Sequence, residues 1–400
     1  MALRIAYFGT YDPAYPRNRV LLAGLRAAGA TVVEYDAPLS AELTAARMTT
    51  VVGAGRLASE LVRAHLRLAA GHRRGVTFDV VLVGYPGHLS VPFAWAVARF
   101  RRAPLVFDPL VSLYDTFVGD RGLVGGQGVA ARTAVTAVRA ADRLAFRLPD
   151  LVLADTEAHA AYYREALGVR GDVTAVVPVG ALPVAAATGS ARNLAPDEPM
   201  VVFQYGKWSP LHGAETVLAA AELLRERAVP VRFVMAGEGQ LSGELRRRVA
   251  DRGLTNVEWL GMLSHAELRR RTLAADVCLG VFGTSAKAAR VVPNKVYDAL
   301  ACGRPVVTAD TPAAREVLRD GEEALLVPAG SAEALAAAIE RLRDGGERLR
   351  LGTNALALYR ERFTPLVLGA ALLGRLEDLC ARRRRGCGGP AAARSADTAS

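Results

Sequence analysis

The feature that most constrains the fold is an alternation, kept along nearly the whole chain, of short apolar runs with longer segments of helical period. Apolar strands separated by helices indicate a parallel sheet that is covered on both faces. In the first half we expect strands at Arg4–Phe8, Thr31–Tyr35, Val80–Gly84, Leu105–Phe107, Leu151–Ala154 and Thr174–Val177. We expect helices at Arg19–Ala28, Leu43–Ala70, Pro92–Arg101, Val129–Phe146 and Glu157–Leu167.

The alternation is interrupted once, at Pro183–Pro199, which is rich in Ala, Gly, Ser and Pro and indicates a linker. A second series of elements follows. Its expected strands are Val201–Tyr205, Val231–Ala236, Val257–Leu260, Val277–Gly280, Pro305–Thr308 and Ala324–Val327. Its expected helices are Gly213–Arg227, Leu241–Arg252, His265–Ala275, Lys295–Cys302 and Ala332–Arg343, with further helical segments beyond Arg350.

The length also favours two domains, because 400 residues is long for a single core. We expect two doubly wound α/β domains facing a central cleft, where a ligand would bind outside the carboxyl ends of the strands. The expected division is an N-terminal domain at 1–180, a linker at 181–199, a C-terminal domain at 200–365, a helix at 366–383 and a disordered basic tail at 384–400. The helix could pack back on the N-terminal domain.

Arginine greatly outnumbers lysine among the basic residues. Of 50 basic residues only Lys207, Lys287 and Lys295 are lysines, and all three lie in the second half beside loop or helix-start residues. Lysine is a compact point charge that suits a single phosphate oxygen, whereas arginine is a planar fork. We therefore expect at least two of these lysines to meet the phosphates of a nucleotide. Chance clustering on solvated faces is the alternative.

The net charge of +10 is consistent with a phosphate-bearing ligand, an anionic membrane face or nucleic acid. The basic run Arg382–Arg385 could touch anionic lipid weakly, although a solvated run is the simpler interpretation. Cys278 and Cys302 lie in apolar surroundings and are expected to be buried thiols, as in a reducing cytoplasm. We expect neither a signal peptide nor a membrane span, so a cytoplasmic protein, with the inner membrane face as a peripheral location.

The strongest motif is the segment Val292–Val307. Pro293-Asn294 ends a loop and can cap a helix at its positive end, where Lys295 adds a full charge. Asp298 lies one turn further on, where its carboxylate could accept hydrogen bonds from the two vicinal hydroxyls of a ribose. An ordinary capped helix with an exposed Lys–Asp pair is the alternative.

This segment resembles the donor site of family 4 retaining glycosyltransferases, which have the two-domain GT-B fold. In that family two Glu residues stand eight positions apart. Asp298 falls on the second Glu, whose implied role is to bind the nucleotide ribose. Arg290 falls on the first, which normally contacts the donor sugar, so the chain departs from the family there. The loop Phe282–Lys287 could supply the sugar contact instead, or Arg290 could reach a phosphate.

Further stretches support the resemblance from about Pro178 to Leu342. Tyr205–Gly213 resembles the family loop whose two basic residues grip the diphosphate. Gly206 precedes Lys207, which matches the first basic residue, and His212 stands where the second is usually Lys, so its charge would depend on pH. Shorter matches are an interdomain Pro-x-Gly turn, a glycine turn and a strand with its base-holding loop, at Val176–Gly180, Ala236–Gly239 and Val257–Ser264; Met262 lies in that loop.

The first half is harder to interpret. Gly9 and Thr10 follow the first strand, where the resemblance implies an acceptor loop, and Arg17-Asn18-Arg19 opens a helix that could hold an anionic acceptor. Asp115 and Arg121 follow the fourth strand, and we expect them to orient acceptor or donor sugar. His88 follows the third strand, although a turn or cap is the more ordinary interpretation.

The resemblance implies a retaining hexosyltransferase that moves a sugar from a nucleotide diphosphate sugar to a hydroxyl of a glycan, a lipid-linked or a small-molecule acceptor. Lys207, Lys295 and Asp115 are the expected catalytic groups, and no cofactor is expected. The chain has no Asp-x-Asp, which favours a metal-independent reaction in which lysine replaces the cation. The alternatives are a nucleotide-sugar epimerase of the same fold and a non-catalytic nucleotide or nucleic-acid binder. Because no basic and aromatic residues interleave, we expect no nucleic-acid partner.

Overall fold

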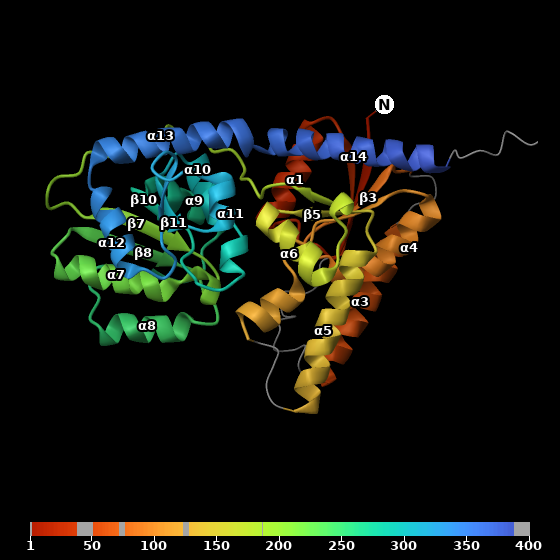
Figure 1. The fold of residues 1–400 in the computed structure, drawn as a ribbon, viewed down its shortest axis with the longest axis horizontal. Helices are drawn as coiled ribbons and strands as arrows, with labels where there is room; N and C mark the ends of the chain where they lie inside the picture. Colours follow the sequence, from red (N-terminus) through yellow and green to blue (C-terminus); the bar gives the residue numbers. More distant parts are fainter. Residues whose placement is uncertain (1, 38–50, 72–76, 123–127, 186, 388–400) are drawn as a thin grey trace, which may run out of the picture.

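The computed structural model describes residues 2–37, 51–71, 77–122, 128–185 and 187–387 and contains two parallel six-stranded sheets (Figure 1). We call the halves built on the first and second sheet the N-terminal and the C-terminal domain. The first sheet has the order β2-β1-β3-β4-β5-β6. Its strands are β1 (Arg4–Gly9), β2 (Thr31–Asp36), β3 (Val80–Val83), β4 (Leu105–Phe107), β5 (Leu151–Ala154) and β6 (Thr174–Val176).

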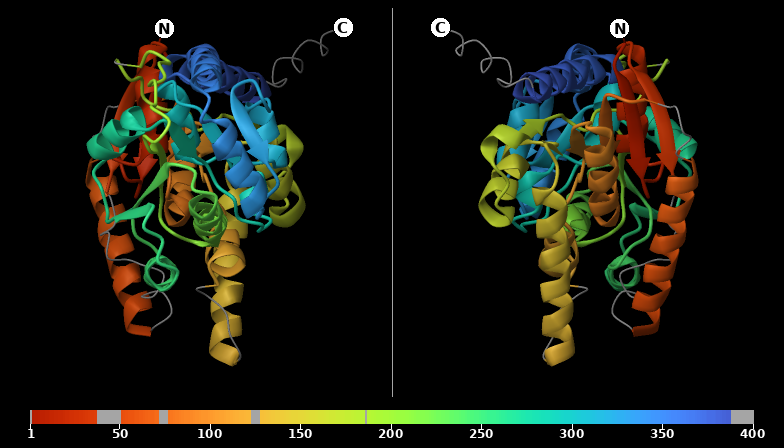
Figure 2. Two further views of the ribbon diagram at one scale, coloured as in Figure 1. Left: turned by 90° about the vertical axis from the view of Figure 1, so that its left-hand side faces the viewer. Right: turned by 90° about the vertical axis from the view of Figure 1, so that its right-hand side faces the viewer.

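Helices cover the first sheet because its strands are apolar on both faces. β3, β4 and β5 are buried along their whole length, as expected for central strands of a parallel sheet. The long helices α3 and α5 project in the same direction on opposite sides of this domain (Figure 2). The helices of the domain are α1 (Pro16–Ala27), α3 (Val51–Gly71), α4 (Val91–Arg101), α5 (Val129–Arg147) and α6 (Glu157–Leu167).

The second sheet has the order β12-β11-β10-β7-β8-β9. The strand order reverses between β7 and β10, and a crevice forms at such a switch point outside the carboxyl ends of the strands. This crevice faces the first domain. The strands are β7 (Met200–Tyr205), β8 (Val231–Ala236), β9 (Val257–Leu260), β10 (Val277–Leu279), β11 (Val306–Ala309) and β12 (Ala324–Val327).

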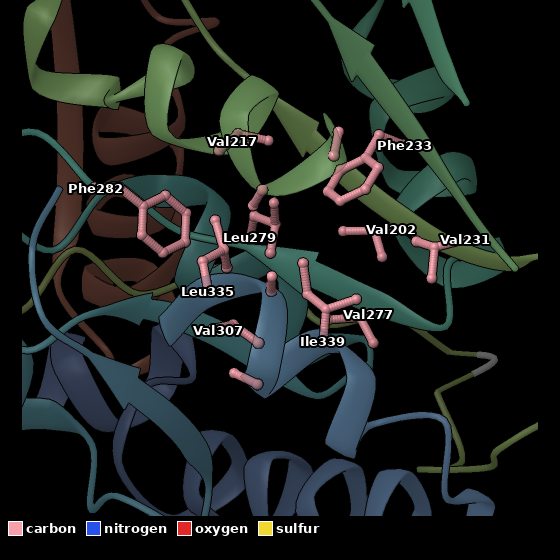
Figure 3. Close-up of a cluster of buried hydrophobic side chains, with 14 of the residues drawn as sticks. Val202, Val217, Val231, Phe233, Val277, Leu279, Phe282, Val307, Leu335 and Ile339 are labelled. Atoms are coloured by element: carbon pink, nitrogen blue, oxygen red, sulfur yellow. The ribbon is translucent and has the colours of Figure 1, made fainter. Parts of the chain in front are cut away.

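Alternate residues of the second sheet enter different cores. Val202 belongs to the core under α7 and α12, whereas Phe203 belongs to the core under α10 and α13. Figure 3 shows the first core, where side chains of four strands meet Val217 of α7 and Leu335 and Ile339 of α12. The helices are α7 (Ala214–Glu226), α8 (Ser242–Asp251), α9 (His265–Ala274), α10 (Asn294–Ala301), α11 (Pro312–Val317), α12 (Ala332–Arg341) and α13 (Gly345–Arg362).

The last helix, α14 (Pro365–Cys387), returns to the N-terminal domain and packs against α1 (Figure 1). Leu372, Leu376 and Leu379 are buried there in the core under the first sheet. The helix runs past residue 384, where we expected disorder, because Arg383 and Arg384 pair with Asp150 and Asp79. Residues 388–400 of the expected tail lie outside the described part of the chain.

The predicted strands are confirmed, each to within about one residue at either end. The helix expected at Leu43–Ala70 is observed from Val51, and its first residues lie outside the described part. Several short elements were not predicted, among them α11 and a π-helical turn at Asp115–Asp120. Cys278 and Cys302 are buried free thiols, as expected. Among the described residues, no helix has the length and apolarity to cross a membrane.

Candidate functional site

A cavity of about 530 Å³ lies between the two domains, at the carboxyl ends of β1, β3, β4 and β5 on one side and of β7 and β10 on the other. This is the place that the switch-point rule assigns to a ligand. Ten of the residues selected from the sequence line it: Arg19, Arg121, Gly206, Lys207, His212, Met262, Lys287, Asn294, Lys295 and Asp298.

The amino end of α10 opens into the middle of the cavity. Pro293 occupies the N-cap position, and no side chain caps the helix, so its first backbone N–H groups are left for a ligand. Asn294 is the first helical residue rather than the cap that we expected. Lys295 is buried, and its Nζ has no hydrogen-bond partner among the residues that the structure describes. Burial lowers the pKa of Lys295 to about 7. A buried ammonium without a partner implies an anionic ligand.

His212 lies beside Lys295, above Gly206. The backbone N–H of Ser209 donates to His212 Nδ1 at 3.4 Å, which leaves the proton of the neutral imidazole on Nε2. A Cβ at Gly206 would lie 2.4 Å from that Nε2 and 3.1 Å from Lys295 Nζ. Burial, and then the charge of Lys295, place the pKa of His212 well below its ordinary value. His212 is therefore neutral near pH 7, and its Nε2–H can donate to an anion over Gly206.

One end of the cavity is built around Asp298. The hydroxyl of Tyr205 donates to its carboxylate. Burial raises the pKa of Asp298, while that hydrogen bond and the charges of Arg269 and His265 lower it. With Met262 and Leu268 nearby in the lining, this end combines a carboxylate acceptor with apolar surface. It suits a hydroxyl-bearing ring system.

The opposite corner joins the two domains. Lys287, from the loop after β10, is buried and donates from Nζ to Thr116 Oγ1 at 2.7 Å. Burial lowers the pKa of Lys287 to about 8, against the charges of Asp120 and Asp115, which raise it. Asp120 and Arg121 line the same corner. The π-helical turn Asp115–Asp120 therefore brings side chains of the N-terminal domain against the C-terminal domain.

Two predicted site residues, Asp115 and Arg290, do not line the cavity because they bind each other. Arg290 Nη2 donates to Asp115 Oδ1 at 2.7 Å, and the guanidinium lies 4.2 Å from the ring centre of Tyr162. The backbone oxygen of Arg290 accepts from Thr156 Oγ1 at 2.6 Å. The expectations that Asp115 faces the cleft and that Arg290 reaches a phosphate are therefore not met in this arrangement.

Three acceptor-side candidates also lie outside the cavity lining. Gly9 has a φ of 127°, and a Cβ at this position would lie 3.4 Å from Ser90, whose hydroxyl lies 3.0 Å from Thr10 Oγ1. His88 is buried, with its Nε2 2.8 Å from the oxygen of Val111. Burial lowers the pKa of His88. These residues support the loops that form the site.

The segment Arg17-Asn18-Arg19 divides into two roles. Arg17 is fully buried and makes a bidentate pair with Asp108, with both N···O distances at 2.9 Å, and it also binds the backbone oxygens of Val177 and Pro178. Asn18 is buried and binds the backbone oxygens of Asp12 and Tyr85. Of the three, only Arg19 faces the cavity.

Several lining residues were not selected from the sequence, namely Asp12, Tyr15, Tyr85 and Asp155, whereas Asp120 follows the fourth strand beside Arg121 and faces the cleft as expected there. They follow strands of the first sheet, so their position was predictable, but the direction of each side chain was not. Asp155 shows why: its carboxylate binds His159 Nδ1 at 2.6 Å, one helical turn away. Among the described residues, no group of three or more His, Cys, Asp or Glu side chains could hold a metal ion.

The cavity thus has cations at its centre and carboxylates at both ends. A ligand that fits this pattern carries its negative charge in the middle and hydroxyl groups on either side. The position of the site at the switch point also suits a ligand with a phosphate group.

Sequence comparisons agree with this site. Residues 199–344 match the model of the family described as glycosyl transferases group 1. The chain is 27% identical over 180 residues to alpha-D-kanosaminyltransferase of Streptomyces kanamyceticus, covering 44% of this chain and 45% of that protein. It is 30% identical over 181 residues to phosphatidyl-myo-inositol mannosyltransferase of Mycolicibacterium smegmatis, again covering 44% and 45%. The matches thus span less than half the length of these relatives.

Structural comparisons cover nearly the whole chain. Sucrose-phosphate synthase of Thermosynechococcus elongatus superposes with a TM-score of 0.70 at 20% identity, covering 96% of this chain and 100% of that one. Anabaena HepE in complex with UDP-glucose gives 0.65 at 17% identity, with 94% and 100% covered. At these identities the match shows the fold alone. Taken together, residues 199–344 resemble the glycosyl transferases group 1 family, family 4 of the glycosyltransferases, and the chain has the GT-B fold.

Proposed function

We propose that the protein is a retaining glycosyltransferase that moves a hexosyl group from a nucleotide diphosphate sugar to an acceptor hydroxyl. The observation that carries the proposal is the buried, unpartnered ammonium of Lys295 at the open end of α10, with His212 Nε2 beside it. Holding a cation there without a partner is costly, and a diphosphate would remove that cost. The relatives described as glycosyltransferases favour the same reaction class.

The proposed donor would lie along the cavity with its ribose at Asp298 and its sugar at the corner where the two domains meet. Asp298 would accept from the ribose hydroxyls, and the base would lie against Met262 and the residues after β9. The diphosphate would lie over Gly206, between Lys295, His212 and the exposed Lys207. The transferred sugar would then reach the corner where the two domains meet. The N-terminal domain would supply the acceptor side, and the acceptor would be a glycan, a lipid-linked or a small molecule with a free hydroxyl.

In the proposed reaction the bond between the anomeric carbon and the phosphate oxygen breaks, and a bond to the acceptor oxygen forms on the same face. The acceptor proton passes to the departing phosphate oxygen. Negative charge grows on the diphosphate as the bond breaks, and Lys295, Lys207 and the N–H groups of α10 would stabilise it as fixed positive charge. These groups support a reaction that needs no divalent cation.

The test is calorimetric titration of UDP, GDP and dTDP into the parent and into Lys295→Met, followed by donor hydrolysis and transfer assays with the matching sugars. We expect one nucleotide to bind the parent and to bind Lys295→Met at least about tenfold more weakly, since a charge-assisted contact is lost. Arg170→Met is the control, because Arg170 is an exposed cation that pairs with Asp172 on the surface. A parent that binds none of the three nucleotides would refute the proposal.

A further inference from the structure

At position 290 the C-terminal domain offers no carboxylate to the sugar end of the proposed donor site. Arg290 stands there, and its guanidinium is turned away from the cavity toward Asp115 and Tyr162. Any carboxylate that binds the transferred sugar must therefore come from elsewhere. In the described part of the chain, the carboxylates that line the cavity are those of Asp12, Asp120, Asp155 and Asp298.

Asp120 lines the corner of the cavity where Lys287 contacts Thr116 of the N-terminal domain. This is the corner that the transferred sugar of the proposed donor would reach. Burial raises the pKa of Asp120, while the charges of Lys287 and Arg121 lower it. Asp120 therefore lies beside Lys287 and Arg121 in this corner.

Asp120 is also held in place. It is 8% exposed, and its Oδ1 lies 3.4 Å from Ser285 Oγ of the loop after β10. Its turn is fixed at the other end by the contacts of Thr116 with Lys287 and of Asp115 with Arg290. A carboxylate fixed in this way can accept hydrogen bonds from two neighbouring hydroxyls.

We propose that Asp120 binds the hydroxyls of the transferred sugar and so determines donor specificity, a role that the N-terminal domain performs in place of position 290. The inference rests on the proposed function. It has a consequence for binding order: the C-terminal domain grips the diphosphate, whereas the sugar is recognised only when the two domains are together. A nucleotide diphosphate without its sugar gains nothing from Asp120.

The experiment compares two ligands on four proteins. The ligands are the nucleotide diphosphate that binds the parent and its hexose derivative, for example UDP and UDP-glucose. The proteins are the parent, Asp120→Asn, Asp298→Asn and Asp172→Asn. We expect Asp120→Asn to bind the nucleotide diphosphate within about twofold of the parent and the nucleotide sugar about tenfold or more weakly, since hydrogen bonds to a charged acceptor are lost. Asp298→Asn should weaken both ligands equally, and the surface variant Asp172→Asn neither.

Equal weakening of both ligands by Asp120→Asn, or no weakening of either, would overturn the inference while leaving the proposed function intact. A parent that binds no nucleotide diphosphate would overturn both. Melting temperatures measured without ligand show whether each variant is folded. If Asp120→Asn does not fold, the same two ligands are compared on Asp120→Ser, which is smaller and uncharged.

Discussion

Arg290 and Asp115 lie 2.7 Å apart across the domain boundary, and their side chains are only 18% and 11% exposed. They come from loops after β10 and β4 that are separated by 175 positions in sequence. Glu316 of α11 adds a second bridge, because its carboxylate accepts from the backbone N–H groups of Glu157 and Ala158 at 2.6 and 2.9 Å. These bonds join the two domains directly, so they stabilise the domain arrangement that surrounds the cavity.

Reversing the charge at position 290 should open the cleft. In Arg290→Glu two carboxylates would face each other in a largely buried place, which is unfavourable by more than the lost pair alone. We expect donor hydrolysis or transfer to fall about tenfold or more in kcat/KM and the radius of gyration in solution scattering to rise. The double variant Arg290→Glu/Asp115→Arg restores an opposite-charge pair. It should recover most of the lost kcat/KM and bring the radius of gyration back toward that of the parent. Unchanged scattering and activity in Arg290→Glu would mean that the pair does not hold the domains together.

Lys295 should make nucleotide binding depend on pH. Its pKa of about 7 in the unliganded protein means that it loses its proton as the pH rises through 7. A diphosphate binds the protonated form, so affinity should fall as the pH rises above 7, by up to about tenfold per unit. Calorimetry of the nucleotide diphosphate between pH 6 and 9 measures the slope. Lys295→Met should remove most of it; a slope that persists in that variant would assign the titration to another group.

The same lysine should affect stability with the opposite sign. Burial lowers the pKa of Lys295 from 10.5 to about 7, so the unfolded chain binds more protons than the folded one between these values. Its unfavourable contribution to the stability of the folded protein is therefore fully present below pH 7 and is relieved as the pH rises toward 10.5. Lys295→Met should raise Tm at pH 6, by roughly 2–4 °C for each kcal/mol recovered, and by less at pH 9. An equal gain at both pH values would contradict the assignment.

Gly206 should be required for the ligand rather than for the fold. A methyl group at this position would lie 2.4 Å from His212 Nε2, so the ring that Ser209 orients must shift. We expect Gly206→Ala to bind the nucleotide diphosphate about tenfold or more weakly with little change in Tm. Gly243→Ala is the matched control, since nothing lies within 4 Å of its added Cβ on α8. Gly243→Ala should leave affinity unchanged and stabilise by about 0.5–1 kcal/mol. Full affinity in Gly206→Ala would place the anion elsewhere.

The fold could be predicted from the sequence because the strands are short apolar runs bounded by turn residues, the central ones β3, β4 and β5 buried along their whole length, and this pattern is local. The centre of the site was also predictable. Lys295 follows Pro293 at a helix start, and Lys207 and His212 follow a strand at the switch point, so their backbone positions determine where they face.

What could not be predicted depends on contacts between distant parts of the chain. Nothing near Asp115 in sequence indicates that Arg290 pairs with it and holds it out of the cavity lining. The π-helical turn that carries Asp115 has no sequence period to reveal it. His88 likewise follows a strand as predicted, but it binds the oxygen of Val111 and packs on Phe107.

The return of α14 to the N-terminal domain depends on two glycines that let the helices approach closely. A Cβ on Gly369 would lie 2.0 Å from the backbone carbon of Gly24, and one on Gly24 would lie 2.2 Å from the backbone oxygen of Pro365. Backbone atoms cannot yield locally, so Gly369→Ala must push α14 away from α1 and loosen the packing of Leu372 and Leu376.

We expect Gly369→Ala to destabilise by about 1–3 kcal/mol, as overpacked cores do, and to lower Tm in thermal unfolding. Gly374→Ala, on the same helix with nothing within 4 Å of its Cβ, should keep or raise Tm because alanine favours the helix. The difference in Tm between the two variants separates the effect of the close α1–α14 contact from the effect of helix propensity. Equal melting temperatures would mean that α14 can move away from α1 at no cost, and that the N-terminal domain does not depend on it.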